Sequence, residues 1–258
     1  MSDKETYGRT SLLVGEDVYD AFSRARVIIF GVGGVGSWCA EGLVRSGVTQ
    51  LTLVDPDVVC PSNVNRQLQA TTATIGQVKV EALRNRLLEI NPEARIEVLR
   101  RTFSEENHEE FGLGGYDYII DAIDSLKDKI ALLLRASETP AVLFSSMGAA
   151  LKMDPTRVRV AEFWNVRGCP LGALLRKKMR KEGHFPKKKF LCVYDEEVLP
   201  NRGTAPAEDA YALEDSEEYG APSRKAVVNG TVAHITAIFG MTLSGLVLND
   251  IYKKTLKA

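Results

Sequence analysis

The sequence predicts an α/β protein with a doubly wound, mainly parallel sheet of the Rossmann-like, nucleotide-binding type, followed by a C-terminal antiparallel extension with a basic insertion. First, short β-rich runs alternate with helical patterns of roughly ten to fifteen residues, as in βαβ units. Second, a glycine-rich stretch separates the first run from the first helix. Third, the alternation stops near residue 150, where Asp154-Pro155-Thr156 indicates a hairpin turn.

The expected elements follow one another along the chain. Strands are predicted at 27–30, 51–54, 95–99, 116–120 and 141–145. Helices are predicted from about 35 to 46, 76 to 90 and 125 to 138, and Asn91-Pro92 stops the second of these. Beyond residue 150, segments 151–153 and 158–163 flank the hairpin turn, and a terminal helix begins at about Thr231.

Composition and charge exclude several classes of protein. The 33 basic and 34 acidic residues give a net charge of −1, which favours neither a nucleic-acid coat nor a membrane-surface protein. Two opposed blocks lie within this balance, a basic one over 167–189 and an acidic one over 195–218, and we expect the acidic block to be a long mobile loop. Cysteines stand alone at Cys39, Cys60, Cys169 and Cys192, which argues against a disulfide framework and a four-cysteine zinc site.

The N-terminus carries no secretory signal pattern, so we expect a cytoplasmic protein. Residues 226–249 contain no Asp, Glu, Lys or Arg and are about long enough to span a bilayer. Asn, Gly, Thr, His and Ser residues interrupt this stretch. We therefore expect a buried or subunit-interface helix without stable membrane insertion, and membrane association through 226–249 is the weaker alternative.

A glycine motif predicts where a nucleotide binds. Gly31, Gly33 and Gly36 form GxGxxG between a strand and a helix, and Asp55 lies nineteen residues beyond Gly36. The glycines allow close backbone approach to phosphate, the helix N-terminus offers N–H groups, and the acid accepts a ribose hydroxyl. A tight turn without a ligand is the structural alternative, and the motif alone does not distinguish NAD from ATP.

Two cations and a carboxylate favour a triphosphate. Arg66, within the stretch 62–67, and Lys79 are of the type that stabilises charge on a leaving pyrophosphate. Asp124 follows a buried strand, and its carboxylate could hold Mg²⁺ together with phosphate oxygens. Taken singly, Lys79 could be a solvated helix residue and Asp124 a helix N-cap.

From residue 7 to about 150 the chain resembles the ubiquitin-activating-like adenylyltransferases, which include the enzymes that activate molybdopterin-synthase and thiamine sulfur carriers. The resemblance rests on Tyr7-Gly8-Arg9, GVGGVGS, LVDPD, SNVNRQ, the helix of Lys79 and DAID. It implies an ATP site with Mg²⁺ on Asp124, and a homodimer in which Arg9 reaches the neighbour's phosphates, although Arg9 alone would be an ordinary terminal arginine. The implied catalytic residues are Arg9, Arg66, Lys79 and Asp124. The implied ATP-binding residues are Gly31, Gly33, Gly34, Gly36, Asp55, Ser62, Asn63, Arg66, Lys79, Asp124 and Ser125.

The second half resembles a narrower group, the bacterial tRNA threonylcarbamoyladenosine dehydratases, at 176–183, 192–194 and 236–242. This resemblance implies adenylation of the carboxylate of threonylcarbamoyladenosine in tRNA, then cyclisation with release of AMP and pyrophosphate. The ring closes by intramolecular attack, so no thioester cysteine is needed. The basic block would contact tRNA phosphates unless it is only a solvated face. The residues concerned are Arg176, Lys177, Lys178, Arg180, Lys181, Lys187, Lys188 and Lys189.

These resemblances divide the chain into three parts and leave three other functions open. We expect an N-terminal dimer arm over 1–25, an ATP-binding domain over 26–150, and an extension over 151–258 with the two charged segments and the terminal helix. The first alternative is adenylation of a small ubiquitin-like sulfur carrier, with Cys169 or Cys192 taking sulfur from a cysteine desulfurase system. The paired CxxC motifs of many carrier-activating enzymes are missing here. The second alternative is an NAD-dependent oxidoreductase, which would leave Arg66 and Lys79 unexplained. The third is a regulatory nucleotide-binding module.

Overall fold

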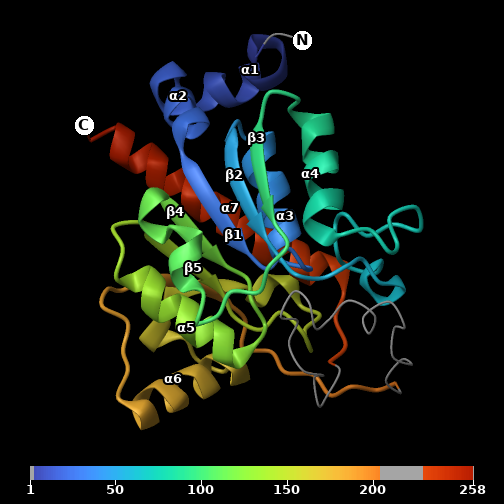
Figure 1. Ribbon diagram of the computed structural model, residues 1–258, viewed down its shortest axis with the longest axis vertical. Helices are drawn as coiled ribbons and strands as arrows, with labels where there is room; N and C mark the ends of the chain where they lie inside the picture. The colour runs from blue at the N-terminus through green and yellow to red at the C-terminus, as the bar shows by residue number, and fades with distance from the viewer. Residues whose placement is uncertain (1–2, 204–228, 258) are drawn as a thin grey trace.

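A seven-stranded sheet with the order β3-β2-β1-β4-β5-β7-β6 forms the centre of the computed structural model, which describes residues 3–203 and 229–257 (Figure 1). Six of these strands pair in parallel, whereas β6 runs antiparallel to β7. The predicted fold class is therefore confirmed. The strands are β1 (Arg26–Phe30), β2 (Gln50–Val54), β3 (Arg95–Leu99), β4 (Tyr118–Asp121), β5 (Val142–Ser146), β6 (Arg159–Glu162) and β7 (Leu191–Tyr194).

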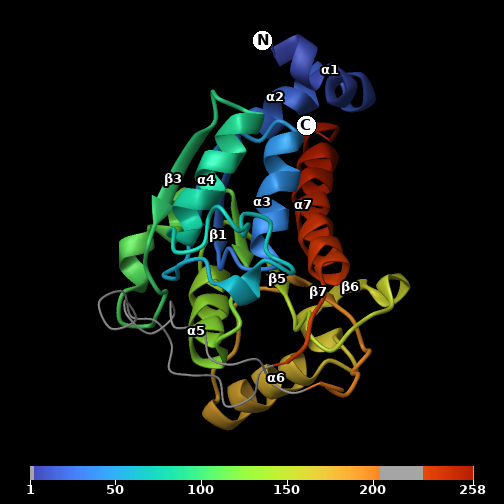
Figure 2. The same cartoon turned by 90° about the vertical axis from the view of Figure 1, so that its right-hand side faces the viewer.

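Helices cover both faces of this sheet. Figure 2 shows α3 and α7 packed side by side, and α5 packs on α6 on the other face. The α-helices are α1 (Asp3–Val14), α2 (Glu16–Arg24), α3 (Gly36–Arg45), α4 (Lys79–Ile90), α5 (Leu126–Ser137), α6 (Pro170–Glu182) and α7 (Ala233–Thr255). The 3₁₀ helices are η1 (Pro61–Asn63), η2 (His108–Phe111), η3 (Leu113–Gly115), η4 (Pro155–Arg157) and η5 (Phe163–Asn165).

The two faces of β1 belong to two different cores. Val27 and Ile29 join the core formed with α3, α4 and α7, whereas Ile28 and Phe30 join the core formed with α5 and α6. All four side chains are fully buried, because successive residues of a strand point to opposite faces. A strand that is apolar throughout is thus explained by helices on both sides.

Two predicted elements differ from the structure. The helix expected from 76 begins at Lys79, because Gly76 has a φ of +85° and Val78 pairs with Val58 in extended conformation. The hairpin of 151–153 with 158–163 was wrong. Leu151 has a φ of +62°, and its backbone N–H and C=O bond to Gly230 and Leu199, so β6 pairs with β7 instead.

The terminal helix α7 is the one described helix long and apolar enough to cross a membrane. Its apolar side nevertheless lies inside the protein, where Phe239, Leu243 and Val247 are fully buried in the core shared with α3. This is the buried helix expected from the sequence. The expected acidic loop lies outside the described residues from 204 onward, and the three-part division of the chain stays a prediction.

Candidate functional site

The glycine-rich loop follows the carboxyl end of β1. Gly31 has a φ of +83°, and a Cβ there would lie 2.7 Å from the carbonyl oxygen of Ala122. A Cβ on Gly36 would lie 1.9 Å from the carbonyl oxygen of Gly31, so the turn needs glycine at both ends. At Gly33 the nearest atom would be 3.8 Å away. Helix N-termini offer N–H groups to phosphate, but the N–H of Ser37 in the first turn of α3 already donates to the carbonyl of Gly33 at 3.2 Å. The donors for a phosphate would therefore come from the loop before Ser37.

Asp55 lies at the end of the neighbouring strand β2 and is tied to the same loop. Its Oδ2 accepts a hydrogen bond from the backbone N of Val32 at 2.9 Å, and its Oδ1 accepts one from the backbone N of Asp57 at 3.0 Å. Burial raises the pKa of Asp55 to about 6, although the nearby ammonium of Lys79 opposes the shift. The carboxylate is placed where the dinucleotide fingerprint puts its ribose-binding acid.

Lys79 is not a solvated helix residue, because only 7% of its side chain is exposed at the start of α4. Its Nζ lies 2.7 Å from Oδ2 of Asp57. Burial opposes the charge of this ammonium, but Asp55 and Asp57 outweigh that effect and raise the pKa of Lys79. The structure thus holds a charged lysine beside the predicted ribose-binding acid.

Arg66 follows η1 and lies against the phosphate loop. A Cβ on Gly34 would be 3.4 Å from the Cγ of Arg66, and the guanidinium Nη1 donates to the carbonyl of Ser62 at 2.7 Å. Asn63 is buried, and its Oδ1 accepts the backbone N–H that precedes η1 at 3.1 Å. The stretch 61–66 is therefore held as a compact turn that carries Arg66 to the loop.

A buried ion pair fixes the turn that precedes Asp124. Asp121, the last residue of β4, and Lys129 on α5 are both fully buried, and Lys129 Nζ lies 2.7 Å from Asp121 Oδ2. Lys129 also donates to the carbonyl of Ile123 at 2.9 Å, while the N–H of Ile123 donates to Asp121 Oδ1 at 3.1 Å. The turn is thus fixed from both sides. Asp124 is exposed, and Ser125 rather than Asp124 takes the N-cap position of α5.

The donor set at this turn fits Mg²⁺ only together with a phosphate. Among the described residues, no group of three His, Cys, Asp or Glu side chains could hold a metal ion. Mg²⁺ commonly takes one or two carboxylates plus phosphate oxygens and water. Asp124 would therefore supply the protein oxygen, and ATP the others.

Sequence reasoning missed three residues that border the loop. The Oε1 of Gln67 is buried without a hydrogen-bond partner in the described part of the chain, and its amide faces Gly33. Thr236 on α7 would contact a Cβ on Gly34 at 3.1 Å, and a Cβ on Gly240 would lie 2.4 Å from the carbonyl of Val35. Sequence signals for all three existed: Gln67 is the last residue of the motif SNVNRQ, and Thr236 and Gly240 lie in the stretch 236–242 that resembles the dehydratases. Buried acceptors without a partner are uncommon in folded proteins, so Gln67 marks this side of the loop as a candidate part of the site.

Arg9 lies far from these residues within one subunit. The neighbouring Tyr7 donates its hydroxyl to the carbonyl of Val44 at 3.2 Å, near the C-terminal end of α3. The phosphate loop precedes the opposite end of this ten-residue helix, about 15 Å away. Figure 1 shows α1 at the end of the molecule away from the loop. Arg9 is exposed there and could reach only the site of another copy.

The basic block is partly turned inward. Arg176 is buried, with Nη1 donating to the carbonyl of Phe163 at 3.1 Å and the guanidinium 5.9 Å from that ring. Lys188 Nζ donates to the carbonyls of Thr139, at 2.6 Å, and Ala141. We correct the sequence interpretation for these two residues, because their donors are used inside the protein. Lys178 is half-buried, whereas the exposed members are Lys177, Arg180, Lys181, Lys187 and Lys189.

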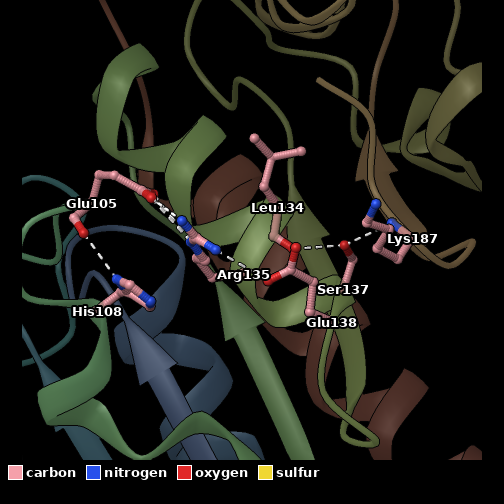
Figure 3. Close-up of polar contacts among 7 residues, drawn as sticks. All are labelled: Glu105, His108, Leu134, Arg135, Ser137, Glu138 and Lys187. Carbon is pink, nitrogen blue, oxygen red and sulfur yellow. Dashed lines mark hydrogen bonds and ion pairs between the residues drawn. The ribbon is translucent and has the colours of Figure 1, made fainter. Parts of the chain in front are cut away.

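Figure 3 shows how the lysine run 187–189 is attached to the end of α5. The backbone N of Lys187 donates to the hydroxyl of Ser137 at 2.8 Å. Two residues before Ser137, Arg135 pairs with Glu105 and, at 3.3 Å, with Glu138. The run therefore has a defined position.

The cysteines do not favour sulfur transfer. Cys169 and Cys192 are 1% and 0% exposed, and burial raises the pKa of Cys192 well above its usual range. The protonated thiol of Cys192 is a poor nucleophile, and burial closes both thiols off from a sulfur donor.

The fold and the loop define a nucleotide-binding protein, and comparison with known proteins identifies its family. The ThiF family model matches residues 7–258, and the chain belongs to this family. It is 37% identical to the tRNA threonylcarbamoyladenosine dehydratase of Bacillus subtilis, over 96% of this chain and 94% of the relative. The crystal structure of the Escherichia coli dehydratase in complex with ATP matches with a TM-score of 0.83 and 30% identity, covering 99% and 98% of the two chains. A molybdopterin-synthase adenylyltransferase of Salmonella typhimurium is 34% identical over 60% of this chain and 62% of its own.

Proposed function

We propose that the protein is an ATP-dependent tRNA dehydratase. It adenylates the carboxylate of N6-threonylcarbamoyladenosine in tRNA and then closes the ring, releasing AMP and pyrophosphate. The observation that carries the proposal is the similarity to dehydratases over 96% of the chain, whereas the similarity to the carrier-activating enzyme covers 60%. Adenylation of a small sulfur carrier is the alternative, and the buried cysteines disfavour a sulfur-relay role. We place the protein in the cytoplasm, as the sequence predicts, and a tRNA substrate is consistent with that location.

The first chemical step needs positive charge around a triphosphate. A carboxylate oxygen of the substrate attacks the α-phosphorus of ATP, and the bond to the β-phosphate breaks with release of pyrophosphate. Lys79 and Arg66, joined by Arg9 of a second copy, stabilise the charge that develops on the leaving group. Mg²⁺, held by Asp124 and phosphate oxygens, supplies further charge neutralisation when bound.

The second step needs mainly orientation. A ureido nitrogen of the same substrate attacks the acyl carbonyl, loses its proton, and displaces AMP as the ring closes. Because the nucleophile is intramolecular, a well-positioned attack replaces much of what a catalytic cysteine would contribute. The buried state of Cys169 and Cys192 is compatible with this chemistry.

Release of AMP and pyrophosphate tests the proposal directly. The purified protein is incubated with ATP and Mg²⁺, with no RNA, with RNase-digested RNA, or with bulk tRNA that carries native modifications. We expect release that depends on intact tRNA, and a tRNA nucleoside lighter by one water in mass spectrometry. Binding of ATP without stimulation by tRNA, together with stimulation by a small carrier protein, would favour the alternative.

A homodimer with Arg9 acting across the interface predicts complementation. Arg9→Ala and Asp124→Ala should each be inactive alone. In a heterodimer of the two variants, one site carries both substitutions and the other carries none. Random exchange of subunits should therefore restore about a quarter of the wild-type AMP release. A mixture that exchanges subunits, as seen by affinity-tag capture, yet stays inactive would contradict the trans role.

The raised pKa of Asp55 predicts a pH dependence of nucleoside binding. The ionised carboxylate is the better acceptor for ribose hydroxyls, and burial raises its pKa to about 6. Adenosine affinity should therefore be highest above pH 6 and fall up to about tenfold per pH unit below it. Adenosine is used because it carries no titrating phosphate in this range. Isothermal titration should show the fall for the wild type and a flat profile for Asp55→Asn; equal profiles would remove Asp55 from the ribose site.

A further inference from the structure

A groove opens at the edge of the sheet opposite the phosphate loop. This cavity of about 350 Å³ is bordered by the beginnings of β5 and β7 and by one side of α7, and its lining includes Lys188, Lys189 and Lys253. We call it the lysine groove. Because β5 and β7 run parallel to β1, their beginnings lie at the edge where β1 begins, whereas the phosphate loop follows the end of β1.

The lysine groove keeps its positive charge. Lys189 and Lys253 are exposed, and within the described part of the chain neither pairs with a carboxylate. The one acid of its lining, Asp250, is already satisfied: its Oδ2 accepts the hydroxyl of Tyr118 at 2.8 Å and lies 2.6 Å from Nζ of Lys254. A concave surface with charge of one sign concentrates counter-ions of the other sign, so the groove fits an anion.

The groove is built from segments far apart in the sequence and held in place. The run 187–189 is tied to α5 through Lys187 and Ser137 (Figure 3). Lys188 fastens the same run to the start of β5 through the carbonyls of Thr139 and Ala141. Lys253 comes from the last turn of α7, more than sixty residues further along the chain. The backbone beneath the lysines is therefore preorganised, which lowers the entropic cost of binding.

We propose that the lysine groove binds the phosphodiester backbone of the tRNA substrate, an inference that rests on the proposed function. The two edges of the sheet are separated by about the length of the five-residue strand β1, roughly 17 Å. Phosphates follow one another at about 3.4 Å along a strand of a nucleic-acid duplex, so backbone a few nucleotides from a base bound at the phosphate loop can reach the opposite edge. Lysines contact phosphates as point charges and add affinity without sequence preference. The surface joins the exposed part of the basic block to the C-terminal end of α7.

Salt dependence of tRNA binding tests the groove. The variant Lys189→Ala/Lys253→Ala is compared with the wild type and with Arg95→Ala, an exposed arginine on the outermost strand β3 at the other end of the sheet. Each lost phosphate contact should lower the slope of log affinity against log salt by about one, so the double variant should lose about two. The slope of Arg95→Ala and the ATP affinity of all three proteins should be unchanged.

A photo-crosslinker provides a second measurement. The four cysteines are buried, so a label should attach selectively to Lys253→Cys or, as the control, to Arg95→Cys. We expect tRNA crosslinks from position 253 and not from position 95. If the wild type shows no AMP release in response to tRNA, the proposed function fails and this assignment fails with it. If the wild type responds and the double variant keeps the full salt slope, only the groove assignment is overturned. If the double variant sediments as a different oligomer but keeps the salt slope of tRNA binding, the groove contacts a second copy of the chain. That outcome would also overturn the assignment of the groove to tRNA.

Discussion

Replacing Lys79 by methionine is expected to slow tRNA-dependent exchange of pyrophosphate into ATP by about 10²- to 10³-fold, or roughly 3–4 kcal/mol of transition-state stabilisation. The reason is that Lys79 Nζ is a nearly buried charge, held 2.7 Å from Asp57 beside the nucleotide loop. A charge fixed in a protected site needs no reorganisation when the pyrophosphate leaves, and a methionine of similar length keeps the packing. The rate is measured with labelled pyrophosphate at saturating ATP.

The matched control for this prediction is Lys127→Met. Lys127 lies in the first turn of α5, close in sequence to Asp124, but 69% of its side chain is exposed and its Nζ pairs with Glu106 at 3.5 Å. Exposed pairs of this kind contribute little, so we expect exchange within a few-fold of the wild type. Equal rates in the two variants would remove Lys79 from the reaction, provided that both unfold in urea at the same concentration.

Replacing Lys129 by methionine should lower the free energy of unfolding by about 3–5 kcal/mol. Asp121 and Lys129 are both fully buried, and removing the lysine leaves an uncompensated carboxylate in the core. The pair also holds the carbonyl of Ile123, so the turn before Asp124 loses one of its two attachments. Equilibrium unfolding in urea, followed by circular dichroism, gives the value.

A double variant separates the charge effect from packing. Asp121→Asn with Lys129→Met removes both charges, while the Asn oxygen can still accept the N–H of Ile123. Replacing both members of a buried pair is often close to neutral, so most of the lost stability should return. Loss of less than about 1 kcal/mol in the single variant, or no recovery in the double variant, would show that the pair does not act as described.

Local signals along the chain predicted much of the fold. Glycine spacing, strand and helix periods and the Asn91-Pro92 stop all act over a few residues, so the nucleotide loop and five strands of the sheet were recognised. The strand β7 was not predicted, because its four residues lie between a lysine run and an acidic segment without a clear alternation. The false hairpin has a similar cause, since the partners of Leu151 come from residues 199 and 230.

In the candidate site, too, local patterns predicted some features, whereas others depend on packing between distant segments. Arg66, Lys79 and Asp124 were selected by residue type and order, and the structure places Arg66 against the loop and Lys79 beside Asp55. A run of like charges does not indicate which side chains of the basic block face inward. Arg176 and Lys188 donate hydrogen bonds to carbonyl groups of the protein, and only the packing of the chain determines these contacts.

By itself, the sequence determined the class of fold, the nucleotide loop and the residue types that favour adenylation, because each depends on spacing within one or two elements. Tertiary structure alone decided three features: the pairing of Asp121 with Lys129, the contact of α7 with the loop through Thr236, and the position of Lys189 and Lys253 on the lining of one groove. In the last two, residues more than sixty positions apart are brought together. Whether a charge is buried, paired or exposed depends on all the elements around it, and that surrounding exists only once the sheet and its helices have packed.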